Sequence, residues 1–67
     1  MIAVVIEHNI GFIAVYFYYS CDKFGCALRV RDNRVIGLDL ICDKKIRQLT
    51  NREIEIINEI IKMYDYI

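Results

Sequence analysis

The last quarter of the chain arranges apolar and charged residues with the period of an α-helix. Between residues 50 and 66 the apolar side chains recur three and four positions apart, which predicts one amphipathic helix. Thr50 precedes this stretch and Glu53 follows three positions later, the spacing of a capping box that begins a helix. The expected apolar face consists of Ile54, Ile56, Ile57, Ile60, Ile61, Met63 and Tyr64.

Upstream of this helix the pattern changes to β-branched and aromatic runs separated by turn residues. Gly11 and the Asp32-Asn33 pair tolerate the left-handed backbone angles that tight turns require. Four strands are therefore expected, over residues 1–7, 12–20, 26–31 and 35–42. The order ββββα predicts an α+β fold, in which a four-stranded antiparallel meander carries one C-terminal helix on one face, as a single domain spanning residues 1–67.

The second predicted strand is apolar on both of its faces. Ile13, Val15 and Phe17 fall on one side, and Phe12, Tyr16 and Tyr18 fall on the other. A single helix covers only one face of a sheet, so the second set is expected to meet a partner. The fourth strand is expected to direct Ile36, Leu38, Leu40 and Cys42 toward the core and Val35 away from it.

Composition supports the expectation of a partner. Hydrophobic residues make up 57% of the 67 positions, which is more apolar surface than one small core hides. We therefore expect a homodimer with its interface on the second strand. The net charge is zero, which excludes a strong overall attraction to nucleic acid or to an anionic membrane.

The N-terminal sequence indicates a cytoplasmic protein. It lacks the basic region and the small-residue cleavage site of a secretory signal. The apolar run over residues 10–19 is too short to cross a bilayer. The abundance of Ile, Asn, Lys and Tyr is typical of AT-rich coding DNA, as in phages and mobile elements.

Catalytic and metal-binding constellations are weak in this sequence. A nucleophilic Cys–His pair has no glycine-flanked nucleophile turn to support it. A zinc set would need Cys21, Cys26, Cys42 and His8, but two of these cysteines fall on predicted core positions. Cys21 and Cys26 flank a turn and are expected to lie opposite each other, where a disulfide is the alternative. Glu7 and Asp39 are the pair of acids that a metal-dependent nuclease would use. We expect no catalytic residue, no metal and no cofactor.

Basic residues cluster around the third predicted turn. Arg29, Arg31 and Arg34 flank Asp32-Asn33, close to the tyrosines of the second strand. Arginine neutralises phosphate and tyrosine stacks on bases, so one hypothesis is a nucleic-acid-binding regulator of the antitoxin or repressor type.

The favoured hypothesis is a non-enzymatic protein-interaction module. It would act as a homodimeric inhibitor or regulator of a host factor, such as a defence system. Tyr and Arg are the residue types that most often anchor protein interfaces. The expected partner-binding residues are Phe12, Tyr16, Tyr18, Arg29, Arg31 and Arg34.

Overall fold

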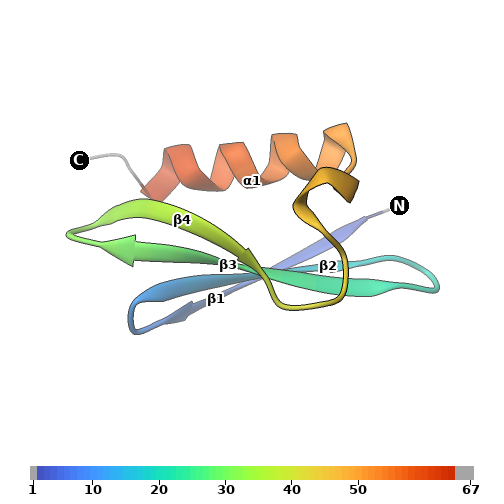
Figure 1. Cartoon of the computed structure of the whole chain (residues 1–67), viewed down its shortest axis with the longest axis horizontal. Coiled ribbons are helices and arrows are strands. Elements are labelled where there is room, and N and C mark those ends of the chain that lie inside the picture. The colour runs from blue at the N-terminus through green and yellow to red at the C-terminus, as the bar shows by residue number, and fades with distance from the viewer. Residues whose placement is uncertain (1, 65–67) are drawn as a thin grey trace.

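The structure is a computed structural model and describes residues 2–64 (Figure 1). Its elements confirm the predicted ββββα layout of an α+β fold. They are, in order, β1 (Ala3–Asn9), β2 (Phe12–Tyr18), β3 (Lys23–Arg31), β4 (Arg34–Leu40), a single 3-10 turn η1 (Ile46–Gln48) and α1 (Asn51–Tyr64). No helix within residues 2–64 is long and apolar enough to span a membrane.

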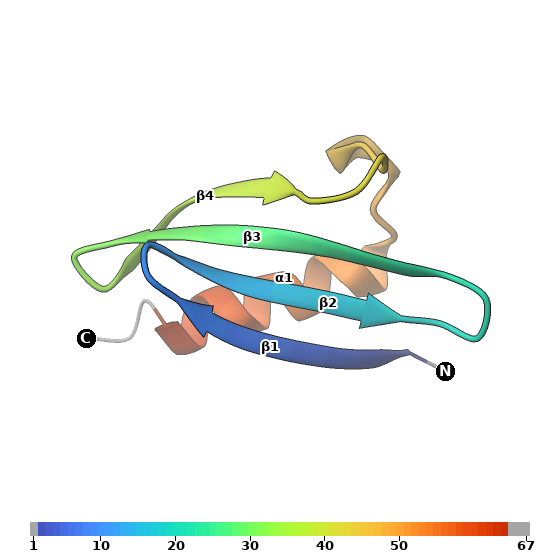
Figure 2. The same cartoon turned by 90° about the horizontal axis from the view of Figure 1, so that it is seen from below.

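The strands form one antiparallel sheet in the order β1-β2-β3-β4, so every neighbour in sequence is a neighbour in space. Helix α1 crosses one face of this sheet (Figure 1). Seen from below, the sheet lies in front of α1, and none of the elements within residues 2–64 covers its other face (Figure 2). We call the helix-covered side the inner face and the uncovered side the outer face.

Two hairpins differ from their predicted boundaries. Strand β1 continues to Asn9, and the loop is only Ile10-Gly11, where Gly11 adopts the expected positive φ of 84°. Strand β2 ends at Tyr18, two residues earlier than predicted, and β3 begins at Lys23, three residues earlier than predicted. In that turn the Tyr19 amide donates a hydrogen bond to the Asp22 carbonyl oxygen at 2.7 Å.

The third hairpin contains a bulge that the alternation did not predict. Asp32 and Asn33 have φ values of 53° and 64°, as expected for a tight turn. Arg29 pairs with Gly37 and Val30 pairs with Val35, so Ile36 is an extra residue on β4. The predicted inward orientation of Ile36 is therefore wrong: its side chain is 53% exposed, whereas Val35 packs against the core.

The core lies between the inner face and α1. Phe17 and Phe24 stack with ring centroids 4.9 Å apart, and Leu28 has no exposed surface. These residues face the buried isoleucines of α1, in agreement with the predicted faces of β2, β3 and the helix. The buried cluster comprises Ile13, Val15, Phe17, Phe24, Cys26, Leu28, Ile56, Ile57 and Ile60.

Helix α1 begins as the capping box predicts. The Thr50 hydroxyl oxygen accepts a hydrogen bond from the Glu53 amide at 3.2 Å, and a Glu53 carboxylate oxygen accepts one from the Thr50 amide at 2.7 Å. The apolar face is narrower than predicted, because Ile54 and Met63 are 42% and 67% exposed. The last two predicted helical positions, 65 and 66, lie outside the described residues.

Candidate protein-binding face

The structure brings the six predicted partner-binding residues onto the outer face. Side chains alternate along a strand, and Ile13, Val15 and Phe17 point into the core, so the intervening residues of β2 point outward. The register then places β3 and β4 residues beside them. The predicted set on this face is Phe12, Tyr16, Tyr18, Arg29, Arg31 and Arg34.

An apolar row crosses the outer face from β1 to Ile41, the residue that follows β4. Val5 pairs with Tyr16 and Tyr16 pairs with Gly25, whose carbonyl oxygen accepts a hydrogen bond from the Ile41 amide at 3.0 Å. A Cβ on Gly25 would lie 2.6 Å from Ile41 Cδ1 and 2.9 Å from Tyr16 Cδ1. The absence of a side chain thus lets both neighbours lie over the β3 backbone. Val5 is 44% exposed and Ile41 is 51% exposed, so this row faces solvent.

Two basic side chains are held in place on the same face. The Lys23 ammonium lies 5.3 Å from the Tyr16 ring centroid and 5.1 Å from that of Tyr18, within cation–π range. Arg29 Nε lies 3.1 Å from an Asp39 carboxylate oxygen. Its guanidinium lies over Gly37, where a Cβ would come within 2.3 Å of it. Glycine at this position therefore accommodates the arginine.

The third hairpin carries two arginines that are not neutralised. Arg31 pairs directly with Arg34 across the strands, and both are exposed. Neither forms an ion pair with any residue in the range 2–64. Like charges facing each other destabilise a sheet slightly. The third hairpin therefore presents two adjacent positive charges to solvent.

The predicted pair of acids is not brought together. Glu7 pairs with Ala14, Ala14 with Ala27, and Ala27 with Asp39, so the acids stand at opposite edges of the sheet. Three strand spacings of about 4.8 Å separate their backbones by about 14 Å. A shared metal would need both carboxylates within a few ångströms, so this arrangement does not supply the nuclease-like pair.

The cysteines and His8 are likewise dispersed. Cys26 is fully buried in β3 and pairs with Val15, whereas Cys21 lies in the exposed turn after β2, so the predicted juxtaposition of these two is wrong. The described part of the chain contains no group of three or more His, Cys, Asp or Glu side chains that could hold a metal ion. Burial raises the pKa of the Cys26 thiol to about 11, with smaller contributions from Cys42 and Glu53.

Sequence reasoning missed a buried polar cluster beneath the start of α1. Glu53 is only 1% exposed and accepts hydrogen bonds from the Tyr19 hydroxyl, from Lys44 Nζ at 2.8 Å and from the Thr50 amide at 2.7 Å. Lys44 Nζ also lies 4.3 Å from the Phe24 ring centroid. Burial raises the pKa of Glu53, but these hydrogen bonds outweigh it and hold the pKa below its ordinary value.

The signal for this cluster was present in the helical spacing. Glu53 precedes Ile56, Ile57 and Ile60 by three, four and seven positions, so it belongs to the buried face. Its partners Tyr19 and Lys44 come from distant segments, and no local pattern connects them.

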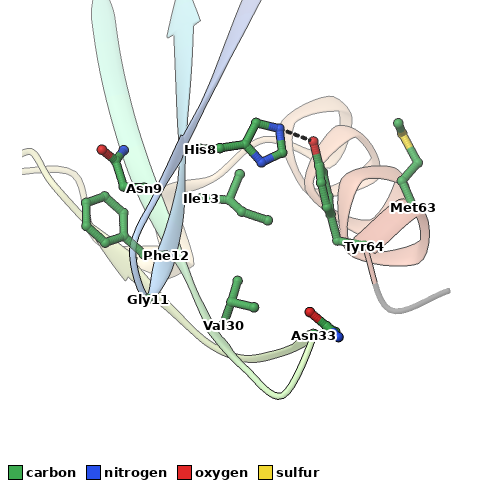
Figure 3. A pocket seen from close by; sticks show the side chains of 9 residues that line it. All are labelled: His8, Asn9, Gly11, Phe12, Ile13, Val30, Asn33, Met63 and Tyr64. Carbon is green, nitrogen blue, oxygen red and sulfur yellow. Dashed lines mark hydrogen bonds between the residues drawn. The ribbon is translucent and has the colours of Figure 1, made fainter. Parts of the chain in front are cut away.

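A second missed feature joins β1 to the end of α1. The predicted first strand ended at residue 7, but His8 lies in β1 and its Nε2 is 2.7 Å from the Tyr64 hydroxyl (Figure 3). The two rings meet edge to face with centroids 5.0 Å apart. They border a hollow of about 350 Å³, whose apolar wall includes Ile13 and Val30. His8 therefore fastens the C-terminal end of the helix to the sheet.

Comparison of this chain with protein-family models, with curated proteins and with solved structures finds no match.

Proposed function

We propose that this protein is a small, non-enzymatic interaction module that binds a protein partner through its outer face. One observation carries the proposal: among the described elements α1 covers only the inner face, and the register places aromatic, aliphatic and arginine side chains on the outer face. Phe12 is 37% exposed and lies directly opposite Arg29 across β2 and β3, four residues along β2 from Tyr16. Aromatic residues and arginine are enriched in protein interfaces and dominate their binding energy.

The partner chemistry follows from the charges. Lys23, Arg31 and Arg34 are not paired with a carboxylate among the described residues, whereas Asp39, near the end of β4, is already paired with Arg29. An acidic rim around an apolar centre would complement this surface. Binding would act by occluding the partner's surface, which fits an inhibitor or regulator of a host factor. We place this activity in the cytoplasm, where thiols such as those of Cys21 and Cys42 remain reduced.

Two alanine substitutions on the outer face test this proposal against a control on the helix. The tagged wild-type protein is used to capture partners from a host lysate. The same capture is repeated with Tyr16→Ala, with Phe12→Ala and with the control Met63→Ala, and the captured proteins are compared. Met63 is 67% exposed on α1, so its truncation removes apolar surface away from the outer face. A central interface residue contributes about 2 kcal/mol or more, which is about a 30-fold loss of affinity.

The outcomes are distinct. A partner retained by the wild type and by Met63→Ala, but lost by Tyr16→Ala and Phe12→Ala, supports the outer face as the binding surface. A partner retained equally by all variants refutes it.

The unneutralised Arg31–Arg34 pair favours one second candidate, a nucleic-acid-binding regulator. Lys23 with Tyr16 and Tyr18 adds a positive charge and aromatic rings to the same face, the two features that proteins binding single strands combine. Fluorescence anisotropy with a single-stranded oligothymidylate at increasing salt tests this candidate. Each phosphate contact to a single strand contributes about −0.7 to the slope of log K against log salt, so Arg31→Ala with Arg34→Ala should reduce the slope by about 1.4. If the wild type does not bind the oligothymidylate even at low salt, this candidate is excluded.

A further inference from the structure

Strand β1 forms one edge of the sheet, and no other described strand lies beyond it (Figure 2). Its first four residues are Ala-Val-Val-Ile, and its one acidic residue, Glu7, comes only after them. The strand has no proline, no lysine and no bulge in its pairing with β2. Proteins usually protect a sheet edge with such features, because an open edge pairs with another strand. The edge of β1 is therefore the unprotected one.

The opposite edge of the sheet is protected. Strand β4 begins with a charged residue, Arg34, and carries another, Asp39. The bulge at Ile36 interrupts its regular pairing. Charges and bulges both discourage the addition of a further strand. The β4 edge is thus protected against pairing with a further strand, whereas the β1 edge is not.

The hydrogen bonds define which groups of β1 are available. The Val30 amide donates to the Gly11 carbonyl oxygen at 2.9 Å, and the Tyr19 amide donates to that of Asp22 at 2.7 Å. Backbone groups alternate along an antiparallel strand, so odd-numbered residues of β2 bond to β3 and even-numbered ones bond to β1. Through the register, the β1 residues that bond to β2 are Ala3, Val5 and Glu7, and those directed outward are Val4, Ile6 and His8.

We propose that β1 pairs with β1 of a second copy of this chain, antiparallel and centred on Val5. Val5 then lies opposite its own copy, and Val4 forms a hydrogen-bonded pair with the partner's Ile6. Both of these residues direct their backbone groups outward, as such a pair requires. Glu7 lies opposite the partner's Ala3, so no like charges face each other. The two sheets become one continuous sheet with a two-fold axis.

The apolar row favours this register over the one centred on Ile6. Pairing centred on Ile6 also keeps every side chain on its face, but it places the exposed Val5 opposite the partner's Glu7. Pairing centred on Val5 joins the row of Val5, Tyr16 and Gly25 to the same row of the second copy. The outer faces of the two copies then form one surface of twice the area, and the pairing buries neither of them. The inference does not depend on what that face binds.

A charge-swap experiment at the two-fold position tests both the pairing and the register. Native mass spectrometry and sedimentation are applied to the wild type, to Val5→Lys, to Val5→Glu and to the control Ile36→Lys. Ile36 is an exposed aliphatic residue of the protected edge strand, so it receives the same substitution at the other edge. The wild type and Ile36→Lys are expected to be dimers, and each Val5 variant alone is expected to be a monomer with an unchanged circular dichroism spectrum.

Mixing the two Val5 variants gives the decisive result. The introduced lysine and glutamate face each other only in the proposed register, so the mixture should form heterodimers while each variant alone does not. Hydrogen exchange supplies a second measurement: the amides of Val4 and Ile6 should exchange about tenfold or more slowly in the dimer than on dilution to monomer.

Several results would overturn the proposal. If the wild type stays monomeric up to a protein concentration of about 1 mM, β1 does not pair with a second copy, and a strand of another protein becomes the candidate for this edge. A dimer that survives Val5→Lys, with fast exchange of the outward amides, places the contact on the outer face instead. A dimer lost in both Val5 variants but not restored by mixing them refutes the register.

Discussion

Replacement of Glu53 by glutamine tests whether the buried cluster stabilises the attachment of α1 to the sheet. The carboxylate is 1% exposed and receives hydrogen bonds from a hydroxyl, an ammonium and a backbone amide. Glutamine keeps the shape but removes the charge and replaces one acceptor oxygen by a donor. Lys44, whose side chain is 26% exposed, then loses its counter-ion in a largely desolvated position.

The magnitude follows from these contacts. Removing one member of a buried ion pair typically costs about 3–5 kcal/mol. Lys44 retains partial contact with water, so we expect Glu53→Gln to cost about 2–4 kcal/mol. A chain of this size has a total free energy of unfolding of about 3–10 kcal/mol. With a denaturant slope of about 1 kcal/mol per molar urea, the midpoint should fall by about 2 M or more.

Urea unfolding followed by circular dichroism measures this effect, and Glu55→Gln is the matched control. Glu55 lies in the same turn of α1, where its carboxylate is 65% exposed and 3.4 Å from Arg52. An exposed pair of this kind contributes at most about 1 kcal/mol. If the two glutamine variants unfold at the same urea concentration, the buried cluster makes no special contribution and the reasoning is refuted.

The pH dependence provides an independent check of the same cluster. The pKa of Glu53 is lower in the folded protein than in the unfolded chain, so the folded state favours the ionised carboxylate. The stability that it contributes is therefore present above the ordinary pKa of 4.5 and is lost as the pH falls below that value. The difference in stability between the wild type and Glu53→Gln should shrink below pH 4.5.

Three further predictions concern other sites. Burial and the neighbouring Glu53 carboxylate raise the pKa of Tyr19 to about 12. The phenol of the unfolded chain ionises near pH 10, so the free energy of unfolding should fall as the pH rises from 10 toward 12. Urea midpoints measured over this range should fall less for Tyr19→Phe than for the wild type. At pH 8, iodoacetamide should modify the exposed Cys21 about 100-fold faster than the buried Cys26, as measured by peptide mass spectrometry, and equal rates would contradict the described burial. Gly25→Ala should cost about 1–3 kcal/mol because its Cβ meets Ile41 Cδ1 at 2.6 Å, and adding Ile41→Val, which removes that atom, should restore part of the loss in thermal unfolding.

The elements that sequence predicted correctly are those with one strong periodicity. In α1, isoleucines at positions 56, 57 and 60 define one buried stripe, and Thr50 with Glu53 marks its start. In β2, alternation placed Phe17 in the core and Tyr16 on the outer face. These patterns are local, so a single segment contains enough information to orient its side chains.

The elements that sequence did not predict depend on contacts between segments. Strand β4 has aliphatic residues at both parities near its start, so alternation alone cannot choose between Val35 and Ile36. The bulge settles this choice by turning Val35 toward the core, and the pairing with β3 determines where it occurs. The buried position of Glu53 is permitted only because Lys44 and Tyr19 supply its hydrogen bonds.

On the outer face some side chains are fixed by contacts within the protein, whereas others point into solvent. The two groups would affect different rate constants of binding. Tyr16 lies on the bare backbone of Gly25 beside Ile41, and Lys23 lies over its ring, so the aromatic centre is already ordered before binding. Such preorganisation reduces the entropy lost on association and slows dissociation. Arg31 and Arg34 are exposed and unpaired among the described residues, and charges of this kind mainly accelerate association and make it sensitive to salt. Truncation of the tyrosine should therefore raise the dissociation rate, whereas truncation of the arginines should lower the association rate.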